Sequence, residues 1–288
     1  MESRKSSVFH VAKNEYLRWI MNPRMILLVC MLLFIMSYVG DSMIAASVKM
    51  EKPLQLFEIF IAVGNSVELC IVIPAVFFLL IGDFPRRDGN TMLYIYRTGK
   101  YQWLLGQLLA AVMDIVTYLG IVVLACIAMG HGHLTVSDRW SETVTRYAIT
   151  YPDDRKATIT SMITGRLYNN FTPLQAFLYS VTLLFGLLFL LTVIKLICFL
   201  LGKATVGVGI VAGLMVFGWT FSLLDSKAKW LLPLSHAIEW QHCDMILRFL
   251  NVPMAYSYFY FAVLSIVGIM VCVFLVDRFD FGCTERQM

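Results

Sequence analysis

Six apolar segments, separated by polar connections, run along the chain. They cover residues 25–40, 56–82, 104–129, 175–201, 205–224 and 255–276. An α-helix needs about 20 mainly apolar residues to cross the hydrocarbon core of a bilayer, and the helix satisfies its own backbone hydrogen bonds there. The pattern therefore predicts an all-α polytopic membrane protein with six transmembrane helices, in which residues 1–288 form a single transmembrane domain. The first segment is short for a crossing, and residues 41–55 are expected to form a polar connection.

Residues 8–21 predict an amphipathic helix ahead of the first apolar segment. Tyr16 and Trp19 fall on one side of a helical wheel and Arg18 falls on the other. A helix with a basic polar face and an aromatic apolar face is typical of the headgroup plane of a membrane. Pro23 ends the pattern, because proline has no N–H to donate and disfavours helix in the residue before it.

Composition supports the membrane assignment. The chain has 288 residues, of which 59% are hydrophobic and 15% charged, and its mean hydropathy is +0.74. This is more apolar surface than one soluble core could cover. The net charge of +4 is small and its basic residues are scattered, which argues against a nucleic-acid partner.

Lys and Arg predict the orientation. They are denser in the amino-terminal lead, in residues 84–103, in the turn at Gly202 and in the carboxy-terminal tail than in the other connections. Positive residues gather on the cytosolic side of membrane proteins. We therefore expect a multi-pass protein of the cell membrane with both termini in the cytosol.

Residues 84–103, FPRRDGNTMLYIYRTGKYQW, interrupt the apolar pattern with a basic loop that contains helix signals of its own. Asp88 suits an N-cap, residues 89–96 allow one to two turns, and Gly99 suits the end of the helix. This short helix is unusually apolar for a segment in water, through Met92, Leu93, Tyr94, Ile95 and Tyr96. It is expected to be buried against a partner or the lipid headgroups.

The order of these elements and the loop FPRRDG...LYIYRTGKYQWLLGQ resemble the membrane permease subunit of ABC type 2 transporters. The resemblance implies that the loop carries a coupling helix, residues 91–96, which docks on an ATP-hydrolysing subunit. It implies three kinds of partner: two ABC ATPase subunits, a second permease subunit that is identical or related, and the membrane lipid. The implied ATPase contact comprises Arg86, Arg87, Asp88, Gly89, Thr91, Met92, Leu93, Tyr94, Tyr96 and Arg97. A plain basic interfacial loop is the alternative interpretation.

ATP hydrolysis is expected in a separate chain. The sequence contains no G-x-x-x-x-G-K-[ST] motif, so ATP and Mg would be bound by the partner, and this chain is expected to have no cofactor and no enzyme activity of its own. The most favoured function is a permease, an exporter of an apolar or amphipathic substrate such as a peptide, lipid or drug.

Charged residues within the apolar segments leave two further functions open. Glu68 and Asp114 are costly in a bilayer and must face protein or a wet cavity. They could line a substrate path, carry a coupling ion in a secondary transporter or channel, or only fix helix packing. The other further function is a membrane-embedded enzyme that uses Asp114 or the histidines. Glu58 and Lys195 are interpreted as structural.

The histidines do not predict a metal site. Neither His131 and His133 nor His236 and His242 have the H-E-x-x-H spacing, so all four are expected at the surface. Residues 230–253 are amphipathic but too polar to span. The resemblance implies that they form outer helices which dip part-way into the membrane.

Overall fold

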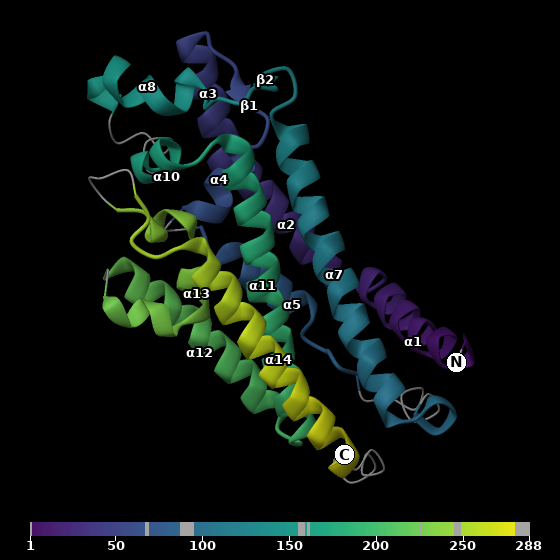
Figure 1. The fold of residues 1–288 in the computed structure, drawn as a ribbon. Helices are drawn as coiled ribbons and strands as arrows, with labels where there is room; N and C mark the ends of the chain where they lie inside the picture. Colours follow the sequence, from purple (N-terminus) through teal and green to yellow (C-terminus); the bar gives the residue numbers. More distant parts are fainter. Residues whose placement is uncertain are drawn as a thin grey trace.

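The computed structural model describes residues 2–66, 69–86, 95–154, 159, 162–224, 226–244 and 249–279. Its long helices form an elongated bundle (Figure 1). In this part of the chain, five helical segments are long and apolar enough to cross a membrane. They are α2 to α3 (Met25–Met50, continuous through a π-helical turn), α7 (Lys100–Met129), α11 (Pro173–Leu200), α12 (Ala204–Leu223) and α14 (Met254–Arg278). The all-α membrane class is confirmed, whereas the expected count of six spanning helices is not.

The first span is longer than the sequence pattern predicted. Helix α2 (Met25–Ile35) passes through a π-helical turn (Met36–Gly40) into α3 (Asp41–Met50), so the helix continues beyond residue 40. The polar residues of 41–50 suggested a connection, but this stretch contains neither proline nor glycine to stop a helix. The helix ends at Glu51, whose φ of 55° is left-handed.

The predicted second span, residues 56–82, is not one helix. It consists of α4 (Glu58–Asn65) and α5 (Val72–Leu80), which follow each other along the bundle (Figure 1). The break begins at Asn65, whose carbonyl oxygen accepts a hydrogen bond from Trp240 Nε1 at 2.7 Å instead of remaining in a helical ladder. Glu68 lies outside the described residues.

Helix α1 (Glu2–Ile20) packs along α7. Val11, Ala12 and Trp19 are buried. A Cβ atom at Gly106 of α7 would lie 2.6 Å from Val11 Cγ1, so only glycine permits this approach. The expected amphipathic helix is present, but part of its apolar face covers α7.

One end of the bundle, which we call the strand end, is closed by short elements. Strands β1 (Leu54–Gln55) and β2 (Leu134–Thr135) pair in parallel, and the helices there are α8 (Glu142–Thr150) and α10 (Gly165–Asn170), with a 3₁₀ turn η2 (Pro152–Asp154) between them. Glu58 joins the segments at this end through hydrogen bonds. Its carboxylate accepts from Ser141 N at 2.8 Å, Ser141 Oγ at 2.8 Å and Gln55 N at 2.9 Å.

Residues 227–252, which we call the cap, contain the 3₁₀ turn η3 (Lys227–Leu231), α13 (Pro233–His236) and the 3₁₀ turn η4 (Glu239–His242). The expectation of surface histidines was wrong for His236 and His242, which are fully buried. Both approach the Ser257 hydroxyl, at 2.8 and 3.2 Å. Burial lowers the pKa of both imidazoles, that of His242 to about 4. Such partners lie far along the chain and leave no local signal.

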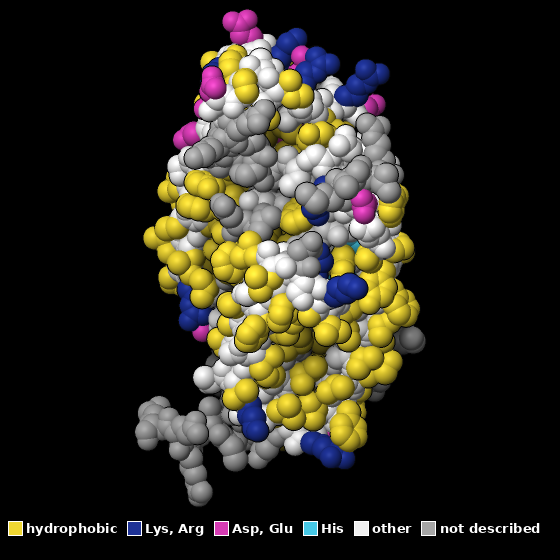
Figure 2. Space-filling model, turned by 90° about the vertical axis from the view of Figure 1, so that its left-hand side faces the viewer, with side chains coloured by type: hydrophobic (Ala, Val, Ile, Leu, Met, Phe, Trp, Pro, Cys, Tyr) yellow, Lys and Arg dark blue, Asp and Glu magenta, His cyan; other side chains and the backbone are white. Residues whose placement is uncertain are grey.

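The surface fits a bilayer. In Figure 2, hydrophobic side chains cover most of the middle and lower part of the visible face, while charged side chains gather near its upper end and Lys and Arg lie at its lower edge. Apolar side chains on α2, α12 and α14 are exposed, among them Ile26, Leu33, Phe217, Phe259 and Met270. An exposed apolar surface of this extent is stable in contact with the hydrocarbon chains of lipid.

Replacing Glu58 by Gln is expected to weaken the strand end. The glutamine amide has one acceptor oxygen where the carboxylate has two. Its NH2 group would therefore lie against an N–H or O–H group that donates to the carboxylate in the wild type. We expect the free energy of unfolding in detergent to fall by about 1–3 kcal/mol. Glu51→Gln, at an exposed position, serves as the control and should change little. Equal stability of both variants would contradict the hydrogen-bonded carboxylate.

Candidate functional site

The connection between α5 and α7, residues 81–99, lies at the end of the bundle opposite the strand end, together with α1 and the last turn of α14 (Figure 1). The structure describes residues 81–86 and 95–99 of it. Residues 95–98 form a helical turn that ends at Gly99, whose N–H donates to Ile95 O at 2.8 Å. The φ of Gly99 is +89°, a value that favours glycine, and α7 starts at the next residue.

The start of the connection, residues 81–86, which we call its entrance, is bonded to α11 and to the residue before α2. Lys195 of α11 is buried, and its Nζ donates to Ile81 O and, at 2.7 Å, to Gly82 O. These carbonyls follow α5, where a cation offsets the negative end of the helix dipole. Asp83 forms an ion pair with Arg24, just before α2, at 2.8 Å. The entrance is therefore held by both α11 and the start of α2.

The exit from the connection is fastened to α14. Lys100 Nζ donates to the carbonyl oxygens of Asp277 and Phe279, each at 3.0 Å. The Tyr101 hydroxyl donates to the Asp277 carboxylate. Since the last carbonyls of a helix lack intrahelical partners, the Lys100 ammonium both caps α14 and ties it to α7.

The last turn of the connection has an inner and an outer side. Ile95 packs against an apolar cluster that includes the buried Val11, Trp103 and Leu104. Tyr96 points into solvent with 96% of its surface exposed, and Arg97 is also exposed. An exposed tyrosine beside an arginine is a pair of residue types enriched in protein interfaces.

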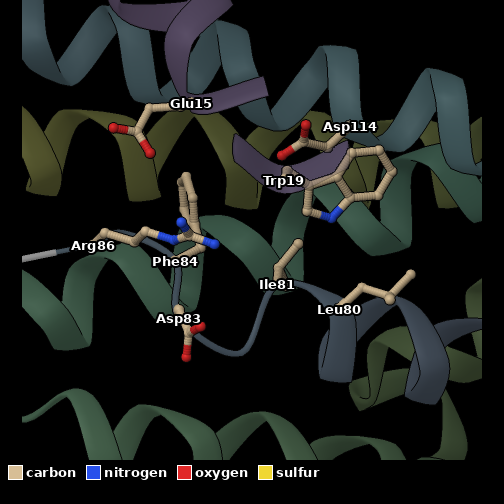
Figure 3. Close-up of a pocket in the computed structure, with 8 residues that line it drawn as sticks. All are labelled: Glu15, Trp19, Leu80, Ile81, Asp83, Phe84, Arg86 and Asp114. Carbon is tan, nitrogen blue, oxygen red and sulfur yellow. The ribbon is translucent and has the colours of Figure 1, made fainter. Parts of the chain in front are cut away.

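A polar pocket lies beside the entrance (Figure 3). It is lined by Glu15, Trp19, Leu80, Ile81, Asp83, Phe84, Arg86 and Asp114. In Figure 3 the Asp114 carboxylate and the Trp19 indole lie on one side, and Asp83, Phe84 and Arg86 come from the connection on the other. The structure thus brings Arg86 and Asp114 to one pocket.

Two buried polar atoms of this pocket lack a hydrogen bond within the described part of the chain. They are Asp114 Oδ1 and Trp19 Nε1, from side chains that are 3% and 5% exposed. One is an acceptor and the other a donor, so the pocket suits a small polar group or a proton. Among the described residues, no set of three or more His, Cys, Asp or Glu could hold a metal.

Most of the contact residues expected from the sequence lie outside the described residues, namely Arg87, Asp88, Gly89, Thr91, Met92, Leu93 and Tyr94, as does Glu68 of the path. Tyr96 and Arg97 are accessible and Arg86 lines the pocket. Sequence reasoning missed Lys100 and Glu15. The one signal for Lys100 was its position directly after a helix-ending glycine.

Comparisons with protein-family models, with curated proteins and with solved structures find no match for this chain.

Removing the Lys195 ammonium is expected to loosen the entrance of the connection. In Lys195→Met the stem is kept, but Gly82 O and Ile81 O, which also accepts from Phe84 N, lose the charged donor, so the free energy of unfolding should fall by about 2–3 kcal/mol. Lys203→Met, at an exposed position, is the control. Chemical denaturation in detergent measures both. A Lys195→Met protein as stable as the control would show that the two bonds do not hold the connection.

Proposed function

We propose that this chain is the membrane permease of an ATP-driven transporter and that a separate ATPase chain drives it through the connection between α5 and α7. The observation that carries the proposal is the fastening of this connection on both sides, by Lys195 and Arg24 at its entrance and by Lys100 and Tyr101 at its exit. A loop with these bonds can pass a displacement to the bundle, whereas a loose loop would absorb it.

The mechanism is mechanical. A partner that grips the exposed Tyr96 and Arg97 side moves the last turn, and the bonds of Lys100 carry that movement to α7 and α14 together. The bonds of Lys195 carry it to α11, the most buried of the five long helices. ATP drives the cycle if it binds one arrangement of the partner ATPases more tightly than the other.

The full assembly is the one implied by the resemblance of the sequence to the permease subunit of ABC type 2 transporters. Two ATPase subunits, which bind ATP and Mg, act on two permeases, identical or related, in the cell membrane. In this proposal the broken pair α4 and α5 supplies a sixth crossing beside the five long helices, so that both termini lie on one side of the membrane. The distribution of Lys and Arg favours the cytosol for that side. The cargo is an exported apolar or amphipathic molecule. No residue of this chain performs bond chemistry.

A second candidate is an ion-coupled transporter or channel. The observation in its favour is Asp114, a buried carboxyl with an oxygen that accepts no hydrogen bond among the described residues. Such a group inside a membrane can carry a proton. The two candidates differ in one requirement, because an ion-coupled protein would be active without an ATPase.

Copurification from the native membrane tests the proposal. We expect a stoichiometric ATPase chain to remain with the tagged permease, and Leu93→Asp combined with Tyr94→Asp to lower its recovery about tenfold or more, since two carboxylates would be buried in the docking surface. Val136→Asp is the control, because Val136 is 83% exposed at the strand end. Unchanged recovery with the double variant, or transport by the chain alone, would refute the proposal.

A further inference from the structure

Glu239 of the cap is a fully buried acid at the place where three parts of the chain meet. Its Oε1 accepts from Asn65 Nδ2 at 3.3 Å and from the Ser180 hydroxyl, which belong to the last turn of α4 and to α11. Its backbone N–H donates to Asn65 Oδ1 at 3.0 Å. With the bond from Trp240 to Asn65 O, these contacts hold the cap against the broken end of α4.

The carboxyl group of Glu239 is only half satisfied. Oε2 is buried and accepts no hydrogen bond within the described residues, and the side chain is 0% exposed. A carboxylate has two acceptor oxygens, and charge on an unsolvated oxygen in a dry interior is costly. Glu58 is equally buried, yet both of its oxygens accept hydrogen bonds. The two acids are therefore equally buried but differ in how many of their oxygens accept a hydrogen bond.

The charged and titratable groups near Glu239 come from α10, α11, α14 and the cap. They are Arg166 of α10, which lies over the Trp240 ring, Tyr179 of α11, Tyr258 of α14, and Lys229, His236, His242 and Cys243 of the cap. None of them forms an ion pair with Glu239 among the described residues. His242 is neutral at pH 7, because burial lowers its pKa to about 4.

We propose that Glu239 is a proton-binding site that holds the cap on α4 and α11, with a proton bound to its carboxyl group at neutral pH. On release, the electron pair of the O–H bond stays on the oxygen and the proton goes to water. The carboxylate then needs hydration, which is available only if the cap separates from Asn65 and Ser180. A metal ion is a poor alternative, since Glu239 belongs to no group of three or more His, Cys, Asp or Glu that could hold a metal in the described part of the chain.

The pH dependence has a defined sign. Burial raises the pKa of Glu239 to about 8 from an ordinary value of 4.5. The folded state thus keeps a proton that the unfolded chain has lost, so the added stability is complete below pH 4.5 and is lost as the pH rises through 8. His236 and His242 are present in both the wild type and a variant of Glu239 alone, so the loss of charge of their unfolded imidazoles around pH 6.5 cancels in the comparison of the two proteins.

Equilibrium unfolding of the full chain in detergent, compared with Glu239→Gln, tests the proposal. The amide keeps an acceptor for Asn65 and Ser180 and cannot ionise. We expect the unfolding constant of the wild type to rise about tenfold relative to that of the variant between pH 6.5 and pH 7.5, because only the wild type loses a proton on unfolding there. Equal slopes with pH, or a Glu239→Gln protein that fails to fold at pH 6.5, would overturn the proposal.

An infrared measurement on the unmodified sequence gives a second, independent answer. With ¹³C-labelled glutamate carboxyls, a protonated glutamic acid should be present at pH 7.5 and should disappear as the pH is raised above 8. Its absence at pH 7.5 would also overturn the proposal. Replacing sodium by choline at constant pH should leave both readings unchanged, whereas a sodium-dependent shift would identify a metal-ion site instead.

Discussion

The position of the α5 to α7 connection depends on the buried ammonium of Lys195. The carbonyls that follow α5 lie beyond its helical ladder. Ile81 O accepts from Phe84 N and from Lys195, and Gly82 O also accepts from Lys195. The ion pair of Arg24 with Asp83 adds a second tie to a different helix. Residues 81–83 at the entrance are thereby tied to α11 and to the start of α2, and the bonds of Lys100 tie the exit to α14.

The broken second span follows from the same requirement for satisfied backbone groups. Where α4 stops, Trp240 and Glu239 bind the carbonyl and side chain of Asn65, so the cap replaces the missing helical bonds. At the other end of α4, Glu58 collects the donors of Gln55 and Ser141. The break is thus tolerated because protein, and not lipid, surrounds it. It also puts a buried acid between the cap and the bundle.

Much of the architecture could be predicted from the sequence. Helices α7, α11, α12 and α14 correspond to predicted spans with small differences at their ends, because each is a long apolar run bounded by polar residues or turns. The first span was predicted too short, since polar residues in 41–50 were taken as a connection although nothing there stops a helix.

The remaining features depend on contacts between distant parts of the chain. The break at Asn65 needs Trp240 and Glu239, and the burial of His236 needs Trp230 and Ser257. No local pattern contains these pairs. At the candidate site, Arg86 and Asp114 could be singled out by residue type, but only the fold brings them together beside Glu15. The fastening by Lys100 was equally invisible, because its acceptors are backbone carbonyls of another helix.

The central claim is that the connection and the bundle move as one body when the partner ATPase acts. Spin labels at Thr98, which is half-buried and outside the proposed ATPase contact, and at the exposed Arg278 report the distance across the Lys100 bonds in the purified complex. We predict that this distance is the same with and without ATP, and that it becomes dependent on ATP when Lys100→Met and Tyr101→Phe remove the bonds. A distance that changes with ATP in the protein with intact bonds would contradict the account, because the connection would then move without the bundle.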